Sequence, residues 1–460
     1  MKSFSINTLG CKVNQYESQQ IRELLEQLGL RQAETSEKAD FAVVNTCCVT
    51  HTASAKSRQH IRKTQNLNPQ ATLVVCGCLP AIAGAELSGL GQDCRLITHK
   101  DDVAGTLIQL ICDRATAENS KRNRSEDTSN DVRNTPNTRC GKRLGSSPQL
   151  PQLVSFQGHT RAFLKIQDGC DGYCTYCIIP KARPQVHSKP AEAVLAEATA
   201  LVRAGHREIV LTGIFLGAYG QDSVRQKTWP KGQNHKLAEL LDEMAEIPDL
   251  ARIRLSSLEP ADVTPRLLDT FCKHRNIMPH LHLSLQSGSD AVLRRMCRQY
   301  TADEFRLTTE LIEARLDRPA ITTDIIVGFP GETEADFEQT VMLAEEVEFA
   351  KIHVFAFSPR KGTAAAKMQD AVPNRVVKER SGRLRELDAQ LQRRFRERFI
   401  GETAEVLLEN KNGQVSGRSE RYFLVHLKEP EEKLQSNQLV TVRLVQNRED
   451  AAVGEPASTA

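Results

Sequence analysis

Three cysteines in one short segment have the spacing of iron–sulfur ligands. Cys170, Cys174 and Cys177 form a C-x3-C-x2-C triplet within the sequence CDGYCTYC. Thiolates at these offsets can coordinate three irons of a [4Fe–4S] cluster, and the fourth iron then stays open to a small molecule. Zinc is the competing metal, but a zinc site needs a fourth ligand to complete its tetrahedron, and His187 could supply one. The triplet therefore predicts a cluster with one exchangeable position.

A second group of cysteines lies nearer the N-terminus. Cys11, Cys47 and Cys78 each follow a short run of residues that favours a strand. The ends of parallel strands meet at one edge of a sheet, and such edges bind ligands. We therefore predict that these three cysteines hold a second [4Fe–4S] cluster, again with one iron free.

The other cysteines lack such a pattern. The chain has 13 cysteines, and in a reducing compartment clustered cysteines bind metal more often than they form disulfides. Cys48 and Cys76 adjoin the second group and are typical of packing residues. We interpret the remaining five as structural, namely Cys94, Cys112, Cys140, Cys272 and Cys297.

Composition indicates a globular protein with several domains. The chain has 460 residues, of which 40% are hydrophobic and 26% charged. The first residues contain no apolar signal segment, and no stretch approaches about 18 consecutive apolar residues. We expect a cytoplasmic protein that does not span a membrane.

The elements that must position the cysteines form two alternating regions. In the first, strand-like runs at 4–9, 41–45, 73–76 and 96–98 alternate with helical stretches, which predicts a parallel α/β sheet. In the second, six strand candidates alternate with helices and predict a partial (βα)6 barrel. These are 162–166, 208–212, 252–255, 280–285, 323–327 and 351–357. The triplet follows the first of them, at the edge where such barrels place their chemistry.

The C-terminal part has a different character. Residues 375–398 contain nine Lys or Arg against four Asp or Glu, although the formal net charge of the chain is only +3. We expect this basic helix to contact nucleic-acid phosphates. The short strands after it predict a small β-barrel.

The predicted organisation has six parts. They are an N-terminal cluster domain (1–113), a flexible linker (114–150), a barrel domain (151–373), the basic helix (374–401), the small β-barrel (402–447) and a disordered tail (448–460).

Two segments together resemble one known family. Residues 8–18 read TLGCKVNQYES, and with the CDGYCTYC segment they resemble the radical SAM methylthiotransferases. The first segment is similar to the branch that acts on N6-threonylcarbamoyladenosine in tRNA. Further matches lie at strand ends, at 211–213, 254–260, 284–289 and 324–333. The resemblance covers nearly the whole chain, and it implies an N-terminal cluster domain, a radical SAM barrel and a C-terminal TRAM-like barrel that binds tRNA.

The resemblance implies an enzyme with two [4Fe–4S] clusters that uses S-adenosylmethionine (SAM). The Cys170, Cys174 and Cys177 cluster would cleave SAM, and the other cluster would present sulfur. The expected product carries a methylthio group on carbon 2 of N6-threonylcarbamoyladenosine, next to the anticodon. The expected partners are tRNA and an electron donor such as a flavodoxin, and the expected state is a monomer. The residues implied to lie near SAM are Thr212, Gly213, Gln286, Val327 and Gly328.

Departures from the family pattern leave alternatives open. Arg183 is followed by Pro184 where the family commonly has Arg-Gly, and residues 417–420 replace a usual Asn-Tyr turn. The same chemistry could act on isopentenyladenosine in tRNA or on a ribosomal-protein aspartate. A third alternative is a non-catalytic RNA-binding protein in which the triplet binds a structural zinc ion.

Overall fold

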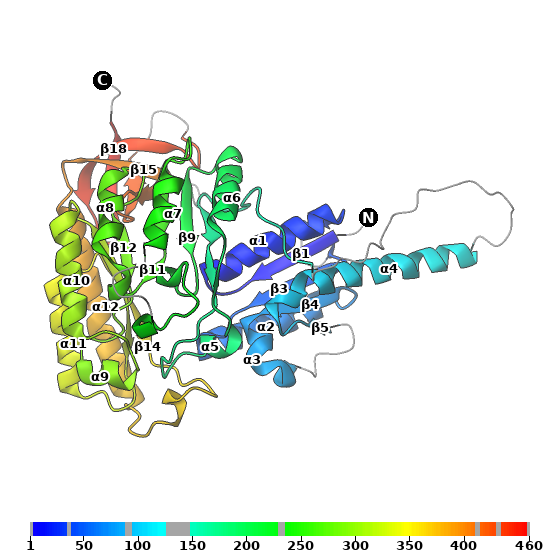
Figure 1. The fold of residues 1–460 in the computed structure, drawn as a ribbon, viewed down its shortest axis with the longest axis horizontal. Coiled ribbons are helices and arrows are strands. Elements are labelled where there is room, and N and C mark those ends of the chain that lie inside the picture. The colour runs from blue at the N-terminus through cyan, green and yellow to red at the C-terminus, as the bar shows by residue number, and fades with distance from the viewer. Residues whose placement is uncertain are drawn as a thin grey trace. The chain divides into compact units, whose positions relative to one another are not determined.

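The computed structural model divides the chain into two compact units, residues 1–153 and 154–460 (Figure 1). It describes residues 3–34, 38–87, 94–125, 148–228, 235–409, 415–428 and 434–457. Among the described helices, none combines the length and the apolarity that crossing a bilayer requires.

The first unit is built on a parallel five-stranded sheet in the order β2-β1-β3-β4-β5. All six residues of the central strand β3 are buried, as expected for a parallel strand that is covered on both faces. The strands are β1 (Ser3–Thr8), β2 (Arg31–Gln32), β3 (Phe41–Thr46), β4 (Thr72–Gly77) and β5 (Cys94–Leu96). The helices are α1 (Lys12–Gln27), α2 (His51–Leu67), α3 (Cys78–Leu87) and α4 (Val103–Ser125). The predicted parallel α/β domain is thereby confirmed.

Helix α4 corrects part of the predicted linker. It runs to Ser125, so residues 114–125 are helical where we expected an irregular segment. Val103, Leu107 and Ile111 anchor the start of this helix in the core. An anchored helix extends easily through residues of good helix propensity, and this stretch contains Ala, Glu, Lys and Arg, so low hydrophobicity did not end it. The rest of the predicted linker, at 126–147, lies outside the described residues.

The second unit contains six parallel strand tracks in chain order, which confirms the predicted partial barrel. One sheet has the order β10-β9-β6 and the other β11-β12-β13-β14. Only Ser256 separates β10 from β11, so the two sheets share one strand track. The strands are β6 (Ala162–Lys165), β9 (Glu208–Thr212), β10 (Arg252–Leu255), β11 (Ser257–Leu258), β12 (His280–Leu283), β13 (Ala320–Val327) and β14 (Lys351–Ala356).

Helices connect these strands. They are α6 (Ala191–Arg203), α7 (Lys236–Ala245), α8 (Pro265–Lys273), α9 (Asp290–Arg295), α10 (Ala302–Arg315) and α11 (Glu334–Val347). The basic helix α12 (Asn374–Glu397) follows β14 and lies beside α11 (Figure 1). This position pairs some of its arginines with the acidic start of α11.

A closed five-stranded barrel follows α12, in the order β15-β16-β17-β19-β18. The strands are β15 (Thr403–Leu408), β16 (Ser416–Ser419), β17 (Leu424–Leu427), β18 (Leu439–Asn447) and β19 (Ala452–Pro456). Val406, Val425, Val442 and Leu444 fill its core and are fully buried. The predicted small β-barrel is confirmed.

One expectation for this barrel is wrong. Residues 452–456, which we placed in a disordered tail, form β19 and pair with both β17 and β18. Ala452 and Val453 are small enough to pack inside the barrel, so a composition typical of disorder also suits a closing strand. Of residues 417–420, which replace the family's usual Asn-Tyr turn, the first three lie in strand β16.

Buried arginines of the partial barrel bind the C-terminal barrel. Arg252 donates from Nη1 to the carbonyl of Arg418 at 3.0 Å, and Arg254 donates from Nη2 to that of Ser419 at 2.7 Å. Glu208 accepts from Arg254 Nε at 2.8 Å. Because unpaired buried charges are costly, these contacts fix the two barrels to each other.

Candidate active site

The cysteine triplet lies in a loop whose two ends are held together by a short antiparallel pair, β7 (Gln167–Asp168) and β8 (His187–Ser188). The buried carboxylate of Asp168 accepts from Arg183 Nη1 at 3.0 Å and from Lys165 Nζ at 2.8 Å. The backbone N–H of Cys170 donates to the carbonyl of Arg183 at 2.9 Å. Arg183, the residue before the departure from the family pattern at Pro184, therefore helps to shape this loop.

Gly169 allows the two ends of the loop to touch. Its φ is +80°, and a Cβ there would lie 1.6 Å from the carbonyl oxygen of Gln185. Only glycine permits so close an approach of two backbones. Glycine is therefore required at position 169 for steric reasons, and not because it contacts a ligand.

The three cysteines face one cavity of about 180 Å³. Apolar and aromatic side chains form much of its wall, and a few charged groups converge on it. The wall residues that matter below are Cys170, Cys174, Cys177, Glu259, Asp262, Ser284, Gln286, Cys297 and Arg298. Cys297, which we interpreted as structural, is therefore a cavity residue.

Arg298 is the charged group in contact with the triplet. Its Nη1 lies 3.2 Å from Cys174 Sγ, its Nε donates to Tyr300 Oη at 3.1 Å, and Glu259 forms an ion pair with it. Burial alone would lower the pKa of Arg298, but Tyr176, Tyr300 and Glu259 outweigh burial and raise it well above its usual value. A permanently charged donor thus faces the position of a thiolate sulfur.

The triplet fits a group that binds thiolates. Burial raises the pKa of both Cys170 and Cys177 to about 12, so these thiols keep their protons until a metal displaces them. The backbone N–H of Gly172 lies 3.4 Å from Cys170 Sγ, and with Arg298 it provides hydrogen bonds to sulfur. Three sulfur donors with N–H partners around one open cavity suit a [4Fe–4S] cluster with one iron left for a small molecule.

Asp262 is the second carboxyl on the wall. Its Oδ2 accepts from the backbone N–H of Glu259 at 2.7 Å. Burial, and then the negative charge of Glu259, raise the pKa of Asp262 to about 8. The cavity therefore holds the Glu259 side chain paired with Arg298, and a second carboxyl, Asp262, that is protonated near neutral pH.

One predicted SAM residue, Gln286, shares this cavity with the cysteines. Its φ is +66°, and its backbone N–H and carbonyl bond to Asp324 and Ile326 of β13 at 2.8 and 2.9 Å. The strand-end backbone is thus fixed and its side chain faces the cavity.

The other four predicted SAM residues are not on the described cavity wall. Thr212 is buried at the end of β9, and Gly213 packs against Gln167, although the next two residues, 214 and 215, do line the cavity. Val327 is buried, and the N–H of Gly328 donates to Glu332 Oε2 at 2.8 Å.

The second cysteine group lies at one edge of the sheet of the first unit. Cys11 directly precedes α1, Cys47 directly follows β3, and Cys78 begins α3 directly after β4. A Cβ on Gly10 would lie 3.1 Å from Cys47 Sγ, which shows how closely the loop after β1 approaches Cys47. Cys11 is exposed, whereas Cys47 and Cys78 are buried.

Neutral side chains tie the three strand ends together. Asn14 Nδ2 donates to the carbonyls of Leu9 and Thr46, both at 2.8 Å. Thr46 Oγ1 donates to the carbonyl of Cys76 at 2.6 Å. These bonds connect the ends of β1, β3 and β4, so the residues present fit a ligand held by three convergent thiols.

Sequence reasoning did not identify Arg298 or Asp262. Neither belongs to a spacing pattern, and Arg298 reaches the triplet from the segment after α9. Cys76, by contrast, lies in the apolar core of the first unit, as a packing residue should.

Two family models match the chain, one within each compact unit. Residues 3–98 match a family described as uncharacterized protein family UPF0004, and residues 164–344 match the radical SAM superfamily.

Several curated proteins are similar over nearly the whole chain. The threonylcarbamoyladenosine tRNA methylthiotransferase MtaB of Chlamydia pneumoniae is 36% identical over 98% of both chains. The protein of the same name from Thermotoga maritima is 37% identical over 93% of this chain and 91% of its own. The tRNA-2-methylthio-N(6)-dimethylallyladenosine synthase of Geobacillus thermodenitrificans is 32% identical over 100% of this chain and 84% of its own.

Among solved structures, the fold is similar to that of the radical SAM methyltransferase TsrM from Kitasatospora setae, whose structure has cobalamin and a [4Fe–4S] cluster bound. The TM-score is 0.51 over 77% of this chain and 72% of that one, at 15% identity. At this identity the likeness concerns the fold alone.

Proposed function

The chain belongs to the radical SAM tRNA methylthiotransferases, as its sequence predicted, and we propose that its substrate is N6-threonylcarbamoyladenosine next to the anticodon, modified at carbon 2. Two observations support this choice of nucleoside. The relatives of Chlamydia pneumoniae and Thermotoga maritima named for it are 36% and 37% identical, against 32% and 35% for two synthases named for dimethylallyladenosine. The segment TLGCKVNQYES is similar to the same branch.

The observation that carries the chemistry is the cavity of the triplet, with Arg298 against Cys174 Sγ. A [4Fe–4S] cluster with SAM supplies a carbon radical, which can take a hydrogen from an adenine carbon that no side-chain base deprotonates. The residues of this chain do the rest. Cys170, Cys174 and Cys177 hold three irons, Arg298 balances charge on sulfur, and the apolar wall limits access of water.

We further propose that Cys11, Cys47 and Cys78 hold the second cluster, which supplies the sulfur. The hydrogen bonds from Asn14 and Thr46 support this assignment, since they bring the three strand ends to one edge without using the cysteine side chains.

The basic helix α12 is the proposed phosphate-contacting surface, although three of its arginines are used internally. Arg380 pairs with Glu332 at 2.8 Å, Arg383 with Glu338 at 2.8 Å, and Arg396 Nε donates to Asn447 at 3.0 Å. Six other basic residues, five on α12 and one directly after it, are exposed and make no ion pair with any described residue. They are Arg375, Lys378, Arg385, Arg393, Arg394 and Arg398.

The proposal is tested with anaerobically reconstituted enzyme, SAM, a reductant and two tRNA substrates that differ only in the modified adenosine. We expect methylthiolation of the threonylcarbamoyladenosine tRNA and at least about tenfold slower reaction with the isopentenyladenosine tRNA, read by mass spectrometry of nucleosides. Preference for isopentenyladenosine would overturn the substrate, and a colourless zinc protein that never cleaves SAM would overturn the chemistry.

A further inference from the structure

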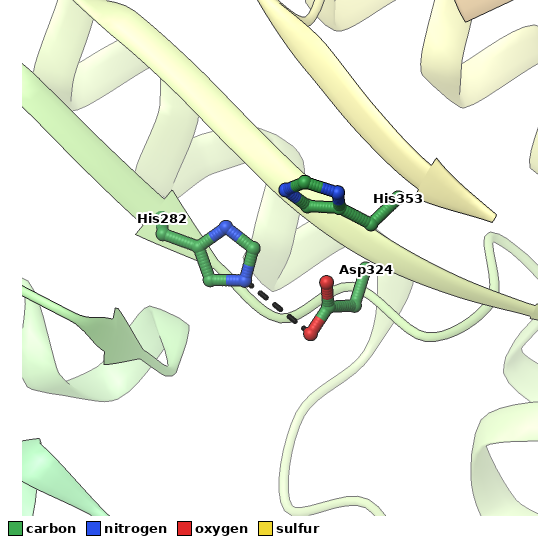
Figure 2. A group of neighbouring side chains, drawn as sticks. All are labelled: His282, Asp324 and His353. Carbon is green, nitrogen blue, oxygen red and sulfur yellow. Dashed lines mark ion pairs between the residues drawn. The ribbon is translucent and has the colours of Figure 1, made fainter. Parts of the chain in front are cut away.

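Two histidines and an aspartate gather on three neighbouring strands of the partial barrel (Figure 2). His282 lies on β12, Asp324 on β13 and His353 on β14, and one ligand atom of each lies within 4.8 Å of those of the other two. We propose that these three residues bind a zinc ion.

Strand register places the three side chains on one face. Asp324 is directly opposite His353, and His282 is directly opposite Thr322, two residues before Asp324 on the same strand. Side chains two residues apart share a face of a sheet. On β12 this face continues from His282 to Ser284, which lines the cavity of the triplet, so the three residues face the inside of the partial barrel.

The imidazole of His282 is held in an orientation that suits a ligand. Its Nδ1 forms a hydrogen bond with Thr322 Oγ1 at 2.9 Å, and its Nε2 then faces Asp324 Oδ2 at 3.3 Å. A partner on one ring nitrogen, with the other directed at the ion, is the usual arrangement around metal-binding histidines.

The local charges also favour a cation. Within the described part of the chain, His282 is the only ion-pair partner of Asp324. The nearest basic side chain on β14, Lys351, pairs instead with Asp388 at 3.7 Å. The ring nitrogens of His353 form no hydrogen bond with any described residue, and its ring lies 5.8 Å from that of His282, measured between centroids. A half-buried carboxylate and two imidazoles on one face of the sheet together provide the donor atoms that a divalent ion needs.

The donor set indicates the class of ion. Two imidazole nitrogens and one carboxylate oxygen are typical of zinc sites that keep a fourth position open for water or a substrate atom. Hard ions such as Mg²⁺ and Ca²⁺ prefer oxygen ligands throughout. Because His353 is exposed, the fourth position would be reached from solvent.

The test measures bound zinc in protein whose cysteines already hold iron. Wild type, His353→Ala and Asp324→Asn are loaded with clusters anaerobically, equilibrated at one fixed free zinc concentration, and analysed for zinc and iron. We expect about one zinc per wild-type chain, at least about tenfold less in both variants, and the same iron content in all three. His187→Ala is the matched control, since His187 is the histidine that a zinc site at the triplet would use, and it should keep its zinc.

Zinc X-ray absorption of the wild type supplies the second measurement. We expect a shell of nitrogen and oxygen only, at about 2.0–2.1 Å, without sulfur. Wild type that retains no zinc, variants that retain as much as wild type, a sulfur shell, or retention of Fe²⁺ in place of zinc would each overturn the proposal. Unchanged iron content and circular dichroism exclude misfolding as the cause of a loss.

Discussion

Cys170, Cys174 and Cys177 lie within eight residues of one loop, whereas Cys11, Cys47 and Cys78 lie at three strand ends that only the sheet brings together. The groups around them differ in the same way. The triplet is in contact with a buried charged network centred on Arg298, and the strand ends are tied by the neutral groups of Asn14 and Thr46. The local cysteine motif therefore receives its charged partners from distant segments of the chain. The cysteines at the strand ends depend instead on neutral hydrogen bonds that keep the strands in place.

Replacing one cysteine ligand in each group should have the largest effect on activity and should distinguish the two groups. Cys174→Ala should abolish SAM cleavage and, with it, methylthiolation. Cys47→Ala should leave SAM cleavage intact and abolish methylthiolation only. Both are measured by chromatography of 5′-deoxyadenosine and of tRNA nucleosides, with Cys272→Ala as the exposed cysteine control. If Cys48→Ala behaves as expected for Cys47→Ala, the ligand assignment in the first unit is wrong by one residue.

Replacing Arg298 tests whether the triplet needs its charged network. Arg298→Met leaves Glu259 buried without a cation, and we expect a loss of about 3–5 kcal/mol of stability. Loss of a positive donor to Cys174 Sγ should also make the reduction potential of the cluster more negative. Potentiometric titration followed by electron paramagnetic resonance measures this change. The double variant Arg298→Met with Glu259→Gln should recover stability but not the potential; an unchanged potential would show that Arg298 is only structural.

Replacing Asn14 tests whether the second group depends on neutral hydrogen bonds. Asn14→Ala removes two hydrogen bonds of 2.8 Å and leaves the carbonyls of Leu9 and Thr46 without this donor. We expect the free energy of unfolding to fall by about 1–3 kcal/mol. Iron content should fall by about half, because only the cluster of the first unit is loosened, and SAM cleavage should persist. Asn68→Ala, which loses a bond to the carbonyl of Ala39 at the other end of the sheet, is the control. An equal loss of SAM cleavage would contradict the separation of the two groups.

The smallest expected effect concerns Asp262 and pH. Its pKa is about 8 in the folded protein against an ordinary 3.8, so between these pH values the folded state holds a proton that the unfolded state has released. Stability due to this group therefore falls as pH rises from about 4 to 8 and is level above that. Asp262→Asn should flatten this fall by about 1 kcal/mol or more, as seen in the thermal midpoint between about pH 5 and pH 8. If the thermal midpoints of wild type and variant change in parallel with pH, Asp262 does not hold the proton proposed here.

The sequence could predict features that are local in the chain, but not those that only the fold brings together. The triplet and the strand tracks were readable because spacing and alternation are local, and β9 and β10 have the predicted bounds. Arg298 and Asp262 could not be found, because burial and pairing give them their chemistry, and neither shows in a spacing. Cys297 was misread for the same reason. Composition also misled at 114–125 and 452–456, where polar or small residues are ordered by the apolar elements next to them.

Strand β19 determines when the C-terminal barrel can finish folding during synthesis of the chain. It is the partner of both β17 and β18, so residues 452–456 must emerge from the ribosome before the C-terminal barrel can close. Until then β17 and β18 present open edges, which are prone to pair with other chains. Truncation before residue 452 would thus keep every cysteine but leave β17 and β18 each without this partner strand.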